Sequence, residues 1–351
     1  MVHSTGSGQA KIAINGFGRI GRLFFRAAFA KASAGQAGLE IVAINDLGNL
    51  ENLAYLLKYD TVYGRYDKEI KMEGGSLVVD GKAVKCFQEK DPAKLPWKDL
   101  GIDVAIEATG FFESYEQAKA HLAAGAKRVV ITAPAKDDDG EIGRTCLVGV
   151  NEEMMKLVKI TSNGSCTTNA ASPVIKVLSE KLGVAKAVLN TTHGYTATQN
   201  LVDGPSKGSD FRRGRAAAQN IVPSTTGSAI AIGRAIEELG GKFDGISLRV
   251  PTVTGSVADI TLVTARKTSV EEVNQILAQA AGEPRWQGIL KVTDEPVVSS
   301  DIIGEPYGAV VDLNFTRVID GDLVKILSWY DNELGYVSTL TKHVELVAKL
   351  V

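Results

Sequence analysis

The amino-acid sequence predicts an α/β fold in two domains: a doubly wound parallel sheet, followed by an α+β domain with a mixed, largely antiparallel sheet. The chain has 351 residues, 44% of them hydrophobic, which is long enough for two cores. Its first third alternates short β-rich runs with helical patterns, the order that gives a parallel sheet. Beyond about residue 165 the strand-like runs are longer, which is typical of an α+β domain.

The elements of the first domain follow from hydrophobic patterns and turn residues. Strand patterns cover Lys11–Asn15, Leu39–Asn45, Ile102–Ala108 and Lys127–Thr132, and helical patterns cover Arg19–Ala34 and Asn49–Lys58. Ser114 and Gln117 form a predicted capping box at the start of a further helix, which ends at Gly125. The run Leu77–Phe87 carries Asp80-Gly81, so we expect a hairpin appended to the sheet.

The second domain combines long strands with separate helices. Strand patterns cover Val184–Thr192, Gly245–Val250, Ser256–Arg266, Ala309–Phe315 and Leu323–Trp329, and helical patterns cover Ser224–Leu239, Ser269–Ala281 and, at the end of the chain, Asn332–Leu350. A second capping box, Ser269 with Glu272, opens the middle helix. The stretch Asp203–Asn220 has no period, and we expect a long ordered loop with a function.

Charge and cysteine content exclude several classes of protein. With 39 Lys+Arg and 41 Asp+Glu the formal charge is −2, and no basic run indicates binding to nucleic acid. No window is long and apolar enough for a membrane helix, and the polar stretch Met1–Gln9 lacks the apolar region of a signal peptide. Three cysteines without a Cys/His cluster argue against a disulfide framework and a structural metal site. We therefore expect a cytoplasmic protein without metal.

A glycine motif follows the first predicted strand. Gly16, Gly18 and Gly21 precede a helix, the context of a dinucleotide-binding fingerprint in a Rossmann-type fold. The three glycines would allow a tight turn, close approach of a pyrophosphate and packing of helix on strand. The alternative is a glycine turn needed only for packing. Asp46 ends the second strand, where a carboxylate accepts ribose hydroxyls and repels a 2′-phosphate, so we expect NAD and not NADP.

Cys166 is the candidate nucleophile. It lies in a run of small polar residues before a helical pattern, and a cysteine in the first turn of a helix has its pKa lowered by the helix dipole and free N–H groups. Pro173 leaves two alternatives: a helix that begins at Cys166 and contains the proline, or one that begins at the proline and is capped by Ser172. A lone cysteine is otherwise a small buried hydrophobe, the interpretation that we keep for Cys86 and Cys146.

His193 is the candidate base. The other three histidines lie in the N-terminal tail (His3) or in helical patterns (His121 and His343), whereas His193 ends a strand that leads into a polar loop. A lone histidine is otherwise a surface residue or a satisfied core residue. One cysteine with one suitably placed histidine is the minimum for covalent thiol catalysis.

These features occur together with blocks that resemble a known family. The blocks are Ile14-Asn-Gly-Phe-Gly-Arg-Ile-Gly-Arg22, Glu107-Ala-Thr-Gly110, Ser165-Cys-Thr-Thr-Asn169, His193 with Thr196, Arg249-Val-Pro251 and Trp329-Tyr-Asp-Asn-Glu333. Their order and spacing closely resemble the phosphorylating glyceraldehyde-3-phosphate dehydrogenases over residues 10–350. The departures are not catalytic groups: Leu334 stands where the family usually has Trp, and Val253-Thr-Gly255 differs from the commoner Pro-Asn-Val.

The resemblance implies a reaction and its site residues. Cys166 would attack the aldehyde of glyceraldehyde 3-phosphate, with His193 as a base of near-neutral pKa, and inorganic phosphate would cleave the resulting thioester. The substrate phosphate would contact Thr196, Thr198 and Arg249, and the attacking phosphate would contact Ser165, Thr167, Thr226 and Gly227. The alternatives are an ordinary helix cap for Thr225-Thr-Gly227 and a structural ion pair for Arg249.

The resemblance also implies the cofactor contacts and the assembly. NAD would be held by Asn15, Arg19, Ile20, Asp46, Thr109, Thr132 and Asn332, together with the three glycines of the motif. Asn332 would bind the nicotinamide amide, and Pro205 favours NAD over NADP. Residues 1–165, with the C-terminal helix 332–351, would form the NAD-binding domain, and residues 166–331 the catalytic domain. The loop Asp203–Arg215 resembles one at a subunit interface, which implies a homotetramer.

Two other functions compete with this one. Erythrose-4-phosphate dehydrogenase shares the thiol chemistry but uses water as the acyl acceptor, and the phosphate site expected at Thr226 and Gly227 argues against it. A binding protein that keeps only the fold is disfavoured by the joint presence of Cys166, His193 and Asn332.

Overall fold

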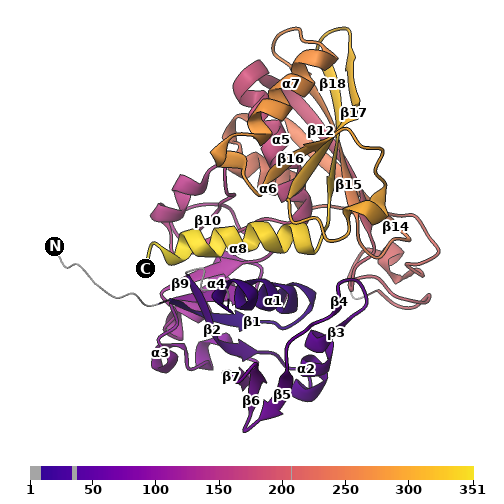
Figure 1. Cartoon of the computed structure of the whole chain (residues 1–351). Coiled ribbons are helices and arrows are strands. Elements are labelled where there is room, and N and C mark those ends of the chain that lie inside the picture. Colours follow the sequence, from indigo (N-terminus) through magenta and orange to yellow (C-terminus); the bar gives the residue numbers. More distant parts are fainter. Residues whose placement is uncertain (1–8, 34–37, 207) are drawn as a thin grey trace, which may run out of the picture. The chain divides into compact units, whose positions relative to one another are not determined.

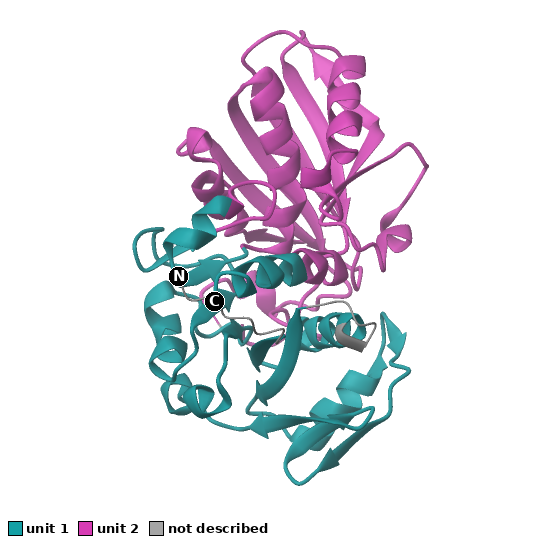
Figure 2. Ribbon diagram, turned by 60° about the vertical axis from the view of Figure 1, so that its left-hand side comes forward, with its two compact units in different colours: residues 1–144, 153–163, 340–351 teal, residues 145–152, 164–339 magenta. Residues whose placement is uncertain are grey.

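The structure, a computed structural model, describes residues 9–33, 38–206 and 208–351 (Figure 1). The chain forms two compact units, coloured separately in Figure 2: unit 1 comprises residues 1–144, 153–163 and 340–351, and unit 2 comprises residues 145–152 and 164–339. The expectations for residues 1–8 of the tail and for Ala34 at the end of the first helix lie outside the described residues.

A nine-stranded sheet forms the centre of unit 1, in the order β10-β11-β9-β8-β1-β2-β7-β6-β5. The strands are β1 (Ala10–Asn15), β2 (Leu39–Asn45), β5 (Ile70–Glu73), β6 (Ser76–Val79), β7 (Lys82–Phe87), β8 (Val104–Glu107), β9 (Arg128–Ile131), β10 (Gly143–Thr145) and β11 (Ile160–Ser162). β1 pairs in parallel with both β2 and β8. The chain therefore reverses its winding direction at β1, and such a switch point places a binding crevice at the carboxyl end of the strand.

The predicted hairpin is confirmed. β6 and β7 are antiparallel, and the turn between them has Asp80 at φ 45° and Gly81 at φ 79°. Two successive positive φ values define the tight hairpin turn that Asp-Gly favours. The hairpin joins the main sheet through the parallel pairing of β7 with β2, and β5, which the sequence analysis missed, adds a further antiparallel strand.

The helices of unit 1 are α1 (Arg19–Ser33), α2 (Leu50–Lys58), α3 (Trp97–Leu100) and α4 (Tyr115–Ala123). Two of them, α2 and α4, begin where a polar side chain accepts from a free N–H group. Ser114 Oγ accepts a hydrogen bond from the N–H of Gln117 at 3.1 Å, as the predicted cap requires. Asp137 accepts from the N–H groups of Tyr115 and Glu116, at 2.7 and 3.0 Å, so a loop carboxylate completes this cap.

A seven-stranded mixed sheet forms the centre of unit 2, in the order β13-β14-β12-β15-β18-β17-β16. The strands are β12 (Val184–Gly194), β13 (Val222–Thr225), β14 (Phe243–Val250), β15 (Ser256–Thr264), β16 (Leu290–Thr293), β17 (Ala309–Ile319) and β18 (Leu323–Tyr330). Four of the six pairings are antiparallel, and β12 with β14 and β16 with β17 are parallel. The predicted fold class is thereby confirmed for both sheets.

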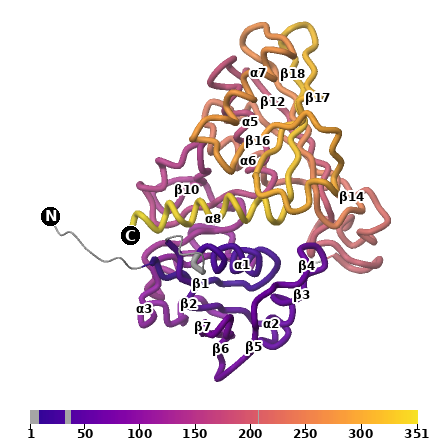
Figure 3. Tube along the Cα trace, in the orientation of Figure 1, coloured from indigo at the N-terminus to yellow at the C-terminus, as the bar shows by residue number. Residues whose placement is uncertain are grey.

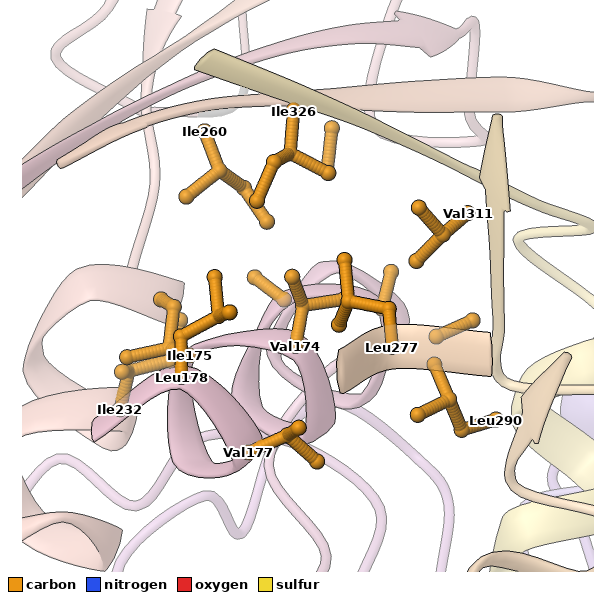
Figure 4. Close-up of a cluster of buried hydrophobic side chains, with 14 of the residues drawn as sticks. Val174, Ile175, Val177, Leu178, Ile232, Ile260, Leu277, Leu290, Val311 and Ile326 are labelled. Carbon is orange, nitrogen blue, oxygen red and sulfur yellow. The ribbon is translucent and has the colours of Figure 1, made fainter. Parts of the chain in front are cut away.

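Helices α5 (Cys166–Leu182), α6 (Ser228–Ala235) and α7 (Val270–Ala281) bury the core of unit 2 against this sheet. Figure 4 shows Val174, Ile175 and Leu178 of α5 near Ile260 and Ile326 of the strands, and all five side chains are buried. Burial of one such side chain stabilises the fold by about 1.5–3 kcal/mol. This core fixes α5, whose first residue is Cys166.

Two predictions for unit 2 need correction. The predicted helix Ser224–Leu239 begins later, because residues 222–225 form strand β13 and only Ser228–Ala235 is α-helical. Residues 222–225 form a strand because they pair with the antiparallel strand β14, and the hydrophobic pattern of a short segment does not reveal such a distant partner. In the second predicted box, Ser269 caps α7, but the Glu272 carboxylate bonds to Arg266 and Thr268, each at 2.7 Å.

The remaining described elements are short, apart from the C-terminal helix. They are β3 (Tyr59–Asp60), β4 (Gly64–Arg65), six 3-10 turns (Pro92–Lys94, Glu152–Leu157, Phe211–Gly214, Glu237–Leu239, Pro284–Trp286, Ser299–Ile302) and α8 (Leu334–Ala348). Figure 3 traces the chain to α8, whose residues from Leu340 onward belong to unit 1. No helix in the described part of the chain is long and apolar enough to cross a membrane.

Candidate active site

A cavity of about 370 Å³ opens in unit 1 at the carboxyl ends of β1, β2 and β8. It is lined by Asn15, Gly16, Gly18, Asn45, Asp46, Leu47, Glu89, Lys90, Ala108, Thr109, Phe111 and Phe112. The structure thus brings together five of the predicted cofactor residues: Asn15, Gly16, Gly18, Asp46 and Thr109. Two others are engaged elsewhere, since Arg19 forms an ion pair with Asp60 and Thr132 donates to the Glu107 carbonyl at 3.1 Å.

The three glycines of the motif differ in what surrounds them. Gly16 has φ +96°, and a Cβ there would lie 2.5 Å from the Ala108 backbone. A Cβ on Gly21 would lie 2.2 Å from the carbonyl oxygen of Gly16. A Cβ on Gly18 would meet no atom within 4 Å, although Gly18 lines the cavity. The absent Cβ of Gly18 therefore leaves a space in which a pyrophosphate can approach the backbone, and the residues fit a bound dinucleotide.

Asp46 is held firmly at the end of β2. Its carboxylate accepts the N–H of Phe17 at 2.6 Å and the N–H of Gly48 at 2.8 Å. The first of these bonds joins Asp46 to the glycine turn itself. A carboxylate with one bond on each oxygen still has lone pairs for ribose hydroxyls.

A buried polar network supports the cavity, and the sequence analysis missed it. The carboxylate of Glu107, at the end of β8, accepts from Asn15 Nδ2 at 2.6 Å, from the N–H of Thr109 at 2.8 Å and from the Thr109 hydroxyl. Trp97 Nε1 donates to His121 Nδ1 at 3.0 Å, so Nε2 carries the ring proton and donates it to Glu107 at 3.0 Å. The only signal in the sequence was an acidic residue at the end of an apolar strand.

In unit 2, Ser165 positions Cys166 at the start of α5. Ser165 Oγ accepts the N–H of Thr168, and Thr168 Oγ1 accepts the N–H of Ser165, both at 3.1 Å, which completes a capping box. The helix runs through Pro173 to Leu182. This decides between the two alternatives: Cys166 is the first residue of the helix.

The thiol and the imidazole are adjacent. Cys166 Sγ lies 3.3 Å from His193 Nε2. His193 stands near the end of β12, where the parallel register pairs it with Arg249 of β14. Arg249 Nη1 lies 2.7 Å from His193 Nδ1, and the carbonyl oxygen of Gly194 also lies 2.7 Å from Nδ1. The ring of Tyr330 packs edge-on against the imidazole, with 5.9 Å between centroids.

The electrostatics of this pair correct the sequence expectations. Burial raises the pKa of the Cys166 thiol, although the Arg249 cation and the Thr167 N–H at the helix start oppose the rise. Burial, together with the neighbouring Arg249 charge, lowers the pKa of His193 to about 3. The predicted lowered pKa of Cys166 and near-neutral pKa of His193 were therefore wrong, because periodicity does not reveal the loss of solvent around both groups. His193 is neutral, and its Nε2 faces the thiol.

Two of the three residues predicted to bind the substrate phosphate, Thr196 and Thr198, form a hydroxyl pair beside the loop. Thr196 Oγ1 and Thr198 Oγ1 lie 3.0 Å apart. Arg213, which the sequence analysis did not single out within the arginine-containing loop, donates to Thr198 Oγ1 at 3.0 Å and to Ser224 Oγ at 2.7 Å. Arg249 donates to His193 Nδ1, and among the described residues it forms no ion pair with a carboxylate.

Two of the four residues predicted to bind the attacking phosphate, Ser165 and Thr226, contact Ser228. Its Oγ lies 2.7 Å from Ser165 Oγ and 2.9 Å from Thr226 Oγ1. Gly227 is the N-cap of α6 and supplies no side chain, so the helix start keeps N–H groups for an anion. Thr167 Oγ1 contacts Tyr330 Oη at 2.8 Å. Ser228 was missed, because it was assigned only to the helix.

Asn332 is buried in unit 2, just before α8. Its Oδ1 accepts from Ser256 Oγ at 2.7 Å and from Thr254 Oγ1 at 3.0 Å. Among residues 9–33, 38–206 and 208–351, no group of three or more His, Cys, Asp or Glu side chains could hold a metal ion.

Comparisons with known proteins agree with this geometry. Residues 10–115 match the model of the glyceraldehyde 3-phosphate dehydrogenase NAD binding domain, and residues 165–332 match that of the C-terminal domain. The glyceraldehyde-3-phosphate dehydrogenase of Mycobacterium tuberculosis H37Rv is 48% identical over 97% of this chain and 98% of its own length. That of Clostridium pasteurianum is 47% identical over 97% and 99%. The predicted resemblance is confirmed: the chain belongs to the glyceraldehyde-3-phosphate dehydrogenase family.

Proposed function

We propose that the chain is a phosphorylating, NAD-dependent glyceraldehyde-3-phosphate dehydrogenase of glycolysis and gluconeogenesis. It oxidises the aldehyde of glyceraldehyde 3-phosphate through a thioester on Cys166, which inorganic phosphate attacks to give 1,3-bisphosphoglycerate. The observation that carries the proposal is the 3.3 Å contact of Cys166 Sγ with His193 Nε2 at a helix start, in a chain of this family.

The thiol and the imidazole divide the covalent chemistry between them. Cys166 Sγ bonds to the aldehyde carbon, and the thiol proton passes to Nε2 of His193. The N–H of Cys166 and the protonated His193 stabilise the oxyanion. His193 returns this proton to the oxyanion, which gives a hemithioacetal hydroxyl, and it accepts the proton again as the carbon is oxidised. NAD, when bound, accepts the hydride. Phosphate oxygen finally bonds to the thioester carbon while the carbon–sulfur bond breaks, which regenerates Cys166.

Arg249 links the substrate phosphate to this proton transfer. A guanidinium only donates hydrogen bonds, so its contact makes Nδ1 of His193 an acceptor and leaves the ring proton on Nε2. A substrate phosphate that draws Arg249 away allows Nδ1 to carry the proton and donate it to the Gly194 carbonyl. Nε2 then has a free lone pair that faces the thiol.

The two anion sites differ in chemistry, which supports two different phosphates. Thr196, Thr198 and Arg249 offer two hydroxyls and a cation for the phosphate of the substrate. Ser165, Thr167, Thr226 and Gly227 offer hydroxyls and the N–H groups of a helix start for the attacking phosphate. The second site favours phosphate over water as acyl acceptor, and so disfavours the erythrose-4-phosphate enzyme.

The cofactor cavity supports NAD in unit 1. The contacts that we propose in this cavity and around it are Asn15, Gly16, Gly18, Arg19, Ile20, Gly21, Asp46, Thr109 and Thr132. We propose Asn332 separately as the residue that binds the nicotinamide amide. Asp46 at the cavity favours the ribose hydroxyls of NAD and repels a 2′-phosphate. Residues 1–165 with 332–351 are accordingly proposed as the NAD-binding domain, and residues 166–331 as the catalytic domain.

A cytoplasmic homotetramer is part of the proposal. Large apolar side chains are exposed in and beside the loop 203–220: Leu201 is 80%, Val202 70% and Phe211 83% exposed. Apolar groups gathered at such a surface are typical of protein contacts. Further exposed residues are Val188 on β12, Ile246 on β14 and Ile221, directly before β13.

NADH formation tests the function. We expect the purified chain to reduce NAD with glyceraldehyde 3-phosphate only when phosphate is present, and the variant Cys166→Ser to lose this turnover while binding NAD normally. Erythrose 4-phosphate serves as the competing substrate. A rate indifferent to phosphate would contradict the proposal, and so would unchanged turnover of the variant.

A further inference from the structure

A directed chain of hydrogen bonds in unit 2 runs through one buried hydroxyl. The N–H of Gly194 donates to Ser256 Oγ at 3.1 Å, and Ser256 Oγ donates to Asn332 Oδ1 at 2.7 Å. Ser256 is the first residue of β15, and its side chain is 1% exposed. A hydroxyl has a single proton, which Asn332 takes, while a lone pair accepts from Gly194.

At one end, this series of hydrogen bonds fixes Gly194, the residue that orients His193. In the ligand-free chain the carbonyl oxygen of Gly194 accepts from Arg249 Nη1 at 3.4 Å, and the same Nη1 donates to Nδ1 of His193 at 2.7 Å, while Nε2 of His193 faces Cys166. Glycine is the most mobile residue of a backbone, so a bond to its N–H restricts it more than it would another residue. A Cβ at Gly194 would lie 2.9 Å from the Thr252 carbonyl oxygen, so a side chain cannot take over this restraint.

At the other end, the same series of hydrogen bonds fixes the side-chain amide of Asn332. Ser256 Oγ donates to Oδ1 of Asn332 at 2.7 Å, and Thr254 Oγ1 lies 3.0 Å from this oxygen and 3.0 Å from Asp331 Oδ1, with one proton to share between them. The Ser256 bond decides which side of the amide carries the NH₂ group, because rotation by half a turn would remove it. The Thr254 hydroxyl bonds to Asp331 and Asn332, so it acts on the Asn332 end alone.

We propose that Ser256 is a positioning residue that orients both halves of the reaction. The Ser256 hydroxyl holds Gly194, whose carbonyl aligns the base His193. The same hydroxyl holds the Asn332 amide, which anchors the carboxamide of the cofactor. The Asn332 half rests on the proposed function, whereas the His193 half concerns the ligand-free chain. Loss of the hydroxyl disturbs both halves, and loss of the Thr254 hydroxyl disturbs only the second.

Three variants test the proposal: Ser256→Ala, Thr254→Val and the matched control Ser247→Ala. Ser247 is also 1% exposed and lies in the same sheet, on β14, but its hydroxyl has no hydrogen-bond partner in the described structure. The control therefore removes a serine hydroxyl at equal depth without touching the chain of bonds. Thermal unfolding establishes first that all three variants fold.

The first measurement is the rate at which iodoacetamide alkylates Cys166 in the ligand-free protein, read by peptide mapping with Cys86 and Cys146 as internal references. We expect Ser256→Ala to slow the reaction about tenfold, as for one hydrogen bond lost from a buried site. The reason is that a loosened His193 holds its Nε2–H less well against the thiolate of Cys166. Thr254→Val and Ser247→Ala keep the wild-type rate. An equal rate in Ser256→Ala and Ser247→Ala overturns the proposal.

The second measurement uses the complex with NAD. Calorimetry gives the affinity of the protein for NAD. A deuterated aldehyde shows which face of the nicotinamide receives the deuterium. Ser256→Ala and Thr254→Val weaken binding and lose single-face transfer, whereas Ser247→Ala retains both. Wild-type-like binding and face selectivity in Ser256→Ala overturn the cofactor half. If the wild-type chain oxidises no aldehyde, the proposed function fails, while the alkylation and calorimetry results still decide the role of Ser256.

Discussion

The substitution Glu107→Gln tests whether one buried carboxylate holds the cofactor cavity in shape. Glu107 is 2% exposed, and it accepts from Asn15 Nδ2, His121 Nε2 and both the N–H and the hydroxyl of Thr109. Glutamine keeps the shape but turns an NH₂ group toward two of these donors. At about 1–3 kcal/mol for each buried donor left unsatisfied, two such donors lower the unfolding free energy of unit 1 by about 2–6 kcal/mol. NAD affinity falls too, because Asn15 and Thr109 line the cavity.

Tryptophan fluorescence can isolate the effect in unit 1. Trp97 lies in unit 1, while Trp286 and Trp329 lie in unit 2, so the background Trp286→Phe/Trp329→Phe leaves Trp97 as the reporter of urea unfolding. The control is Glu116→Gln, whose side chain is 66% exposed and pairs with Lys119 at the surface. That change should stay within about 0.5 kcal/mol. A loss below about 1 kcal/mol in Glu107→Gln, with unchanged NAD affinity, would refute the reasoning.

Two further predictions concern the glycine motif and the imidazole. Gly18→Ala should weaken NAD binding at least about tenfold without changing the Tm, because its Cβ meets no protein atom but fills the pyrophosphate space. Gly21→Ala should lower both the NAD affinity and the Tm, since its Cβ would lie 2.2 Å from a carbonyl oxygen. Calorimetry and thermal unfolding compare the pair, and equal Tm values would contradict it. The pKa of His193 is about 3 in the folded chain and has the ordinary value of 6.5 in the unfolded chain, so protons bind the unfolded chain more tightly. The contribution of His193 to the unfolding free energy is therefore complete above pH 6.5 and is lost as the pH falls toward 3. His193→Gln should therefore flatten the Tm profile in that window, and an unchanged slope would exclude His193 as its source.

The sequence was sufficient for the elements whose signals are local. The glycine motif, the Asp80-Gly81 turn and the caps at Ser114 and Ser269 depend on residues a few positions apart, and the structure has each of them. The start of the helix at Cys166 could not be decided, since Pro173 favours two different starts. The capping box of Ser165 and Thr168, together with the core beneath α5, decides it.

What the sequence could not provide is the set of contacts between distant segments. Glu107, Trp97 and His121 meet through packing, although each alone looks like an ordinary residue of its strand or helix. The directions of the pKa shifts at Cys166 and His193 were missed for the same reason, because burial depends on every neighbouring segment. Ser228 and Ser256 were missed because a lone serine carries no pattern at all.

His193 on β12 and Arg249 on β14 occupy paired positions of one sheet, so the sheet fixes the spacing of their backbones. Adjacent sheet positions keep their spacing through any sequence drift that preserves the ladder, since slippage by one residue would turn every side chain of the strand to the opposite face. Thr196, Thr198 and Arg213 lie outside this ladder, so substitutions at these residues leave the register of His193 with Arg249 unchanged.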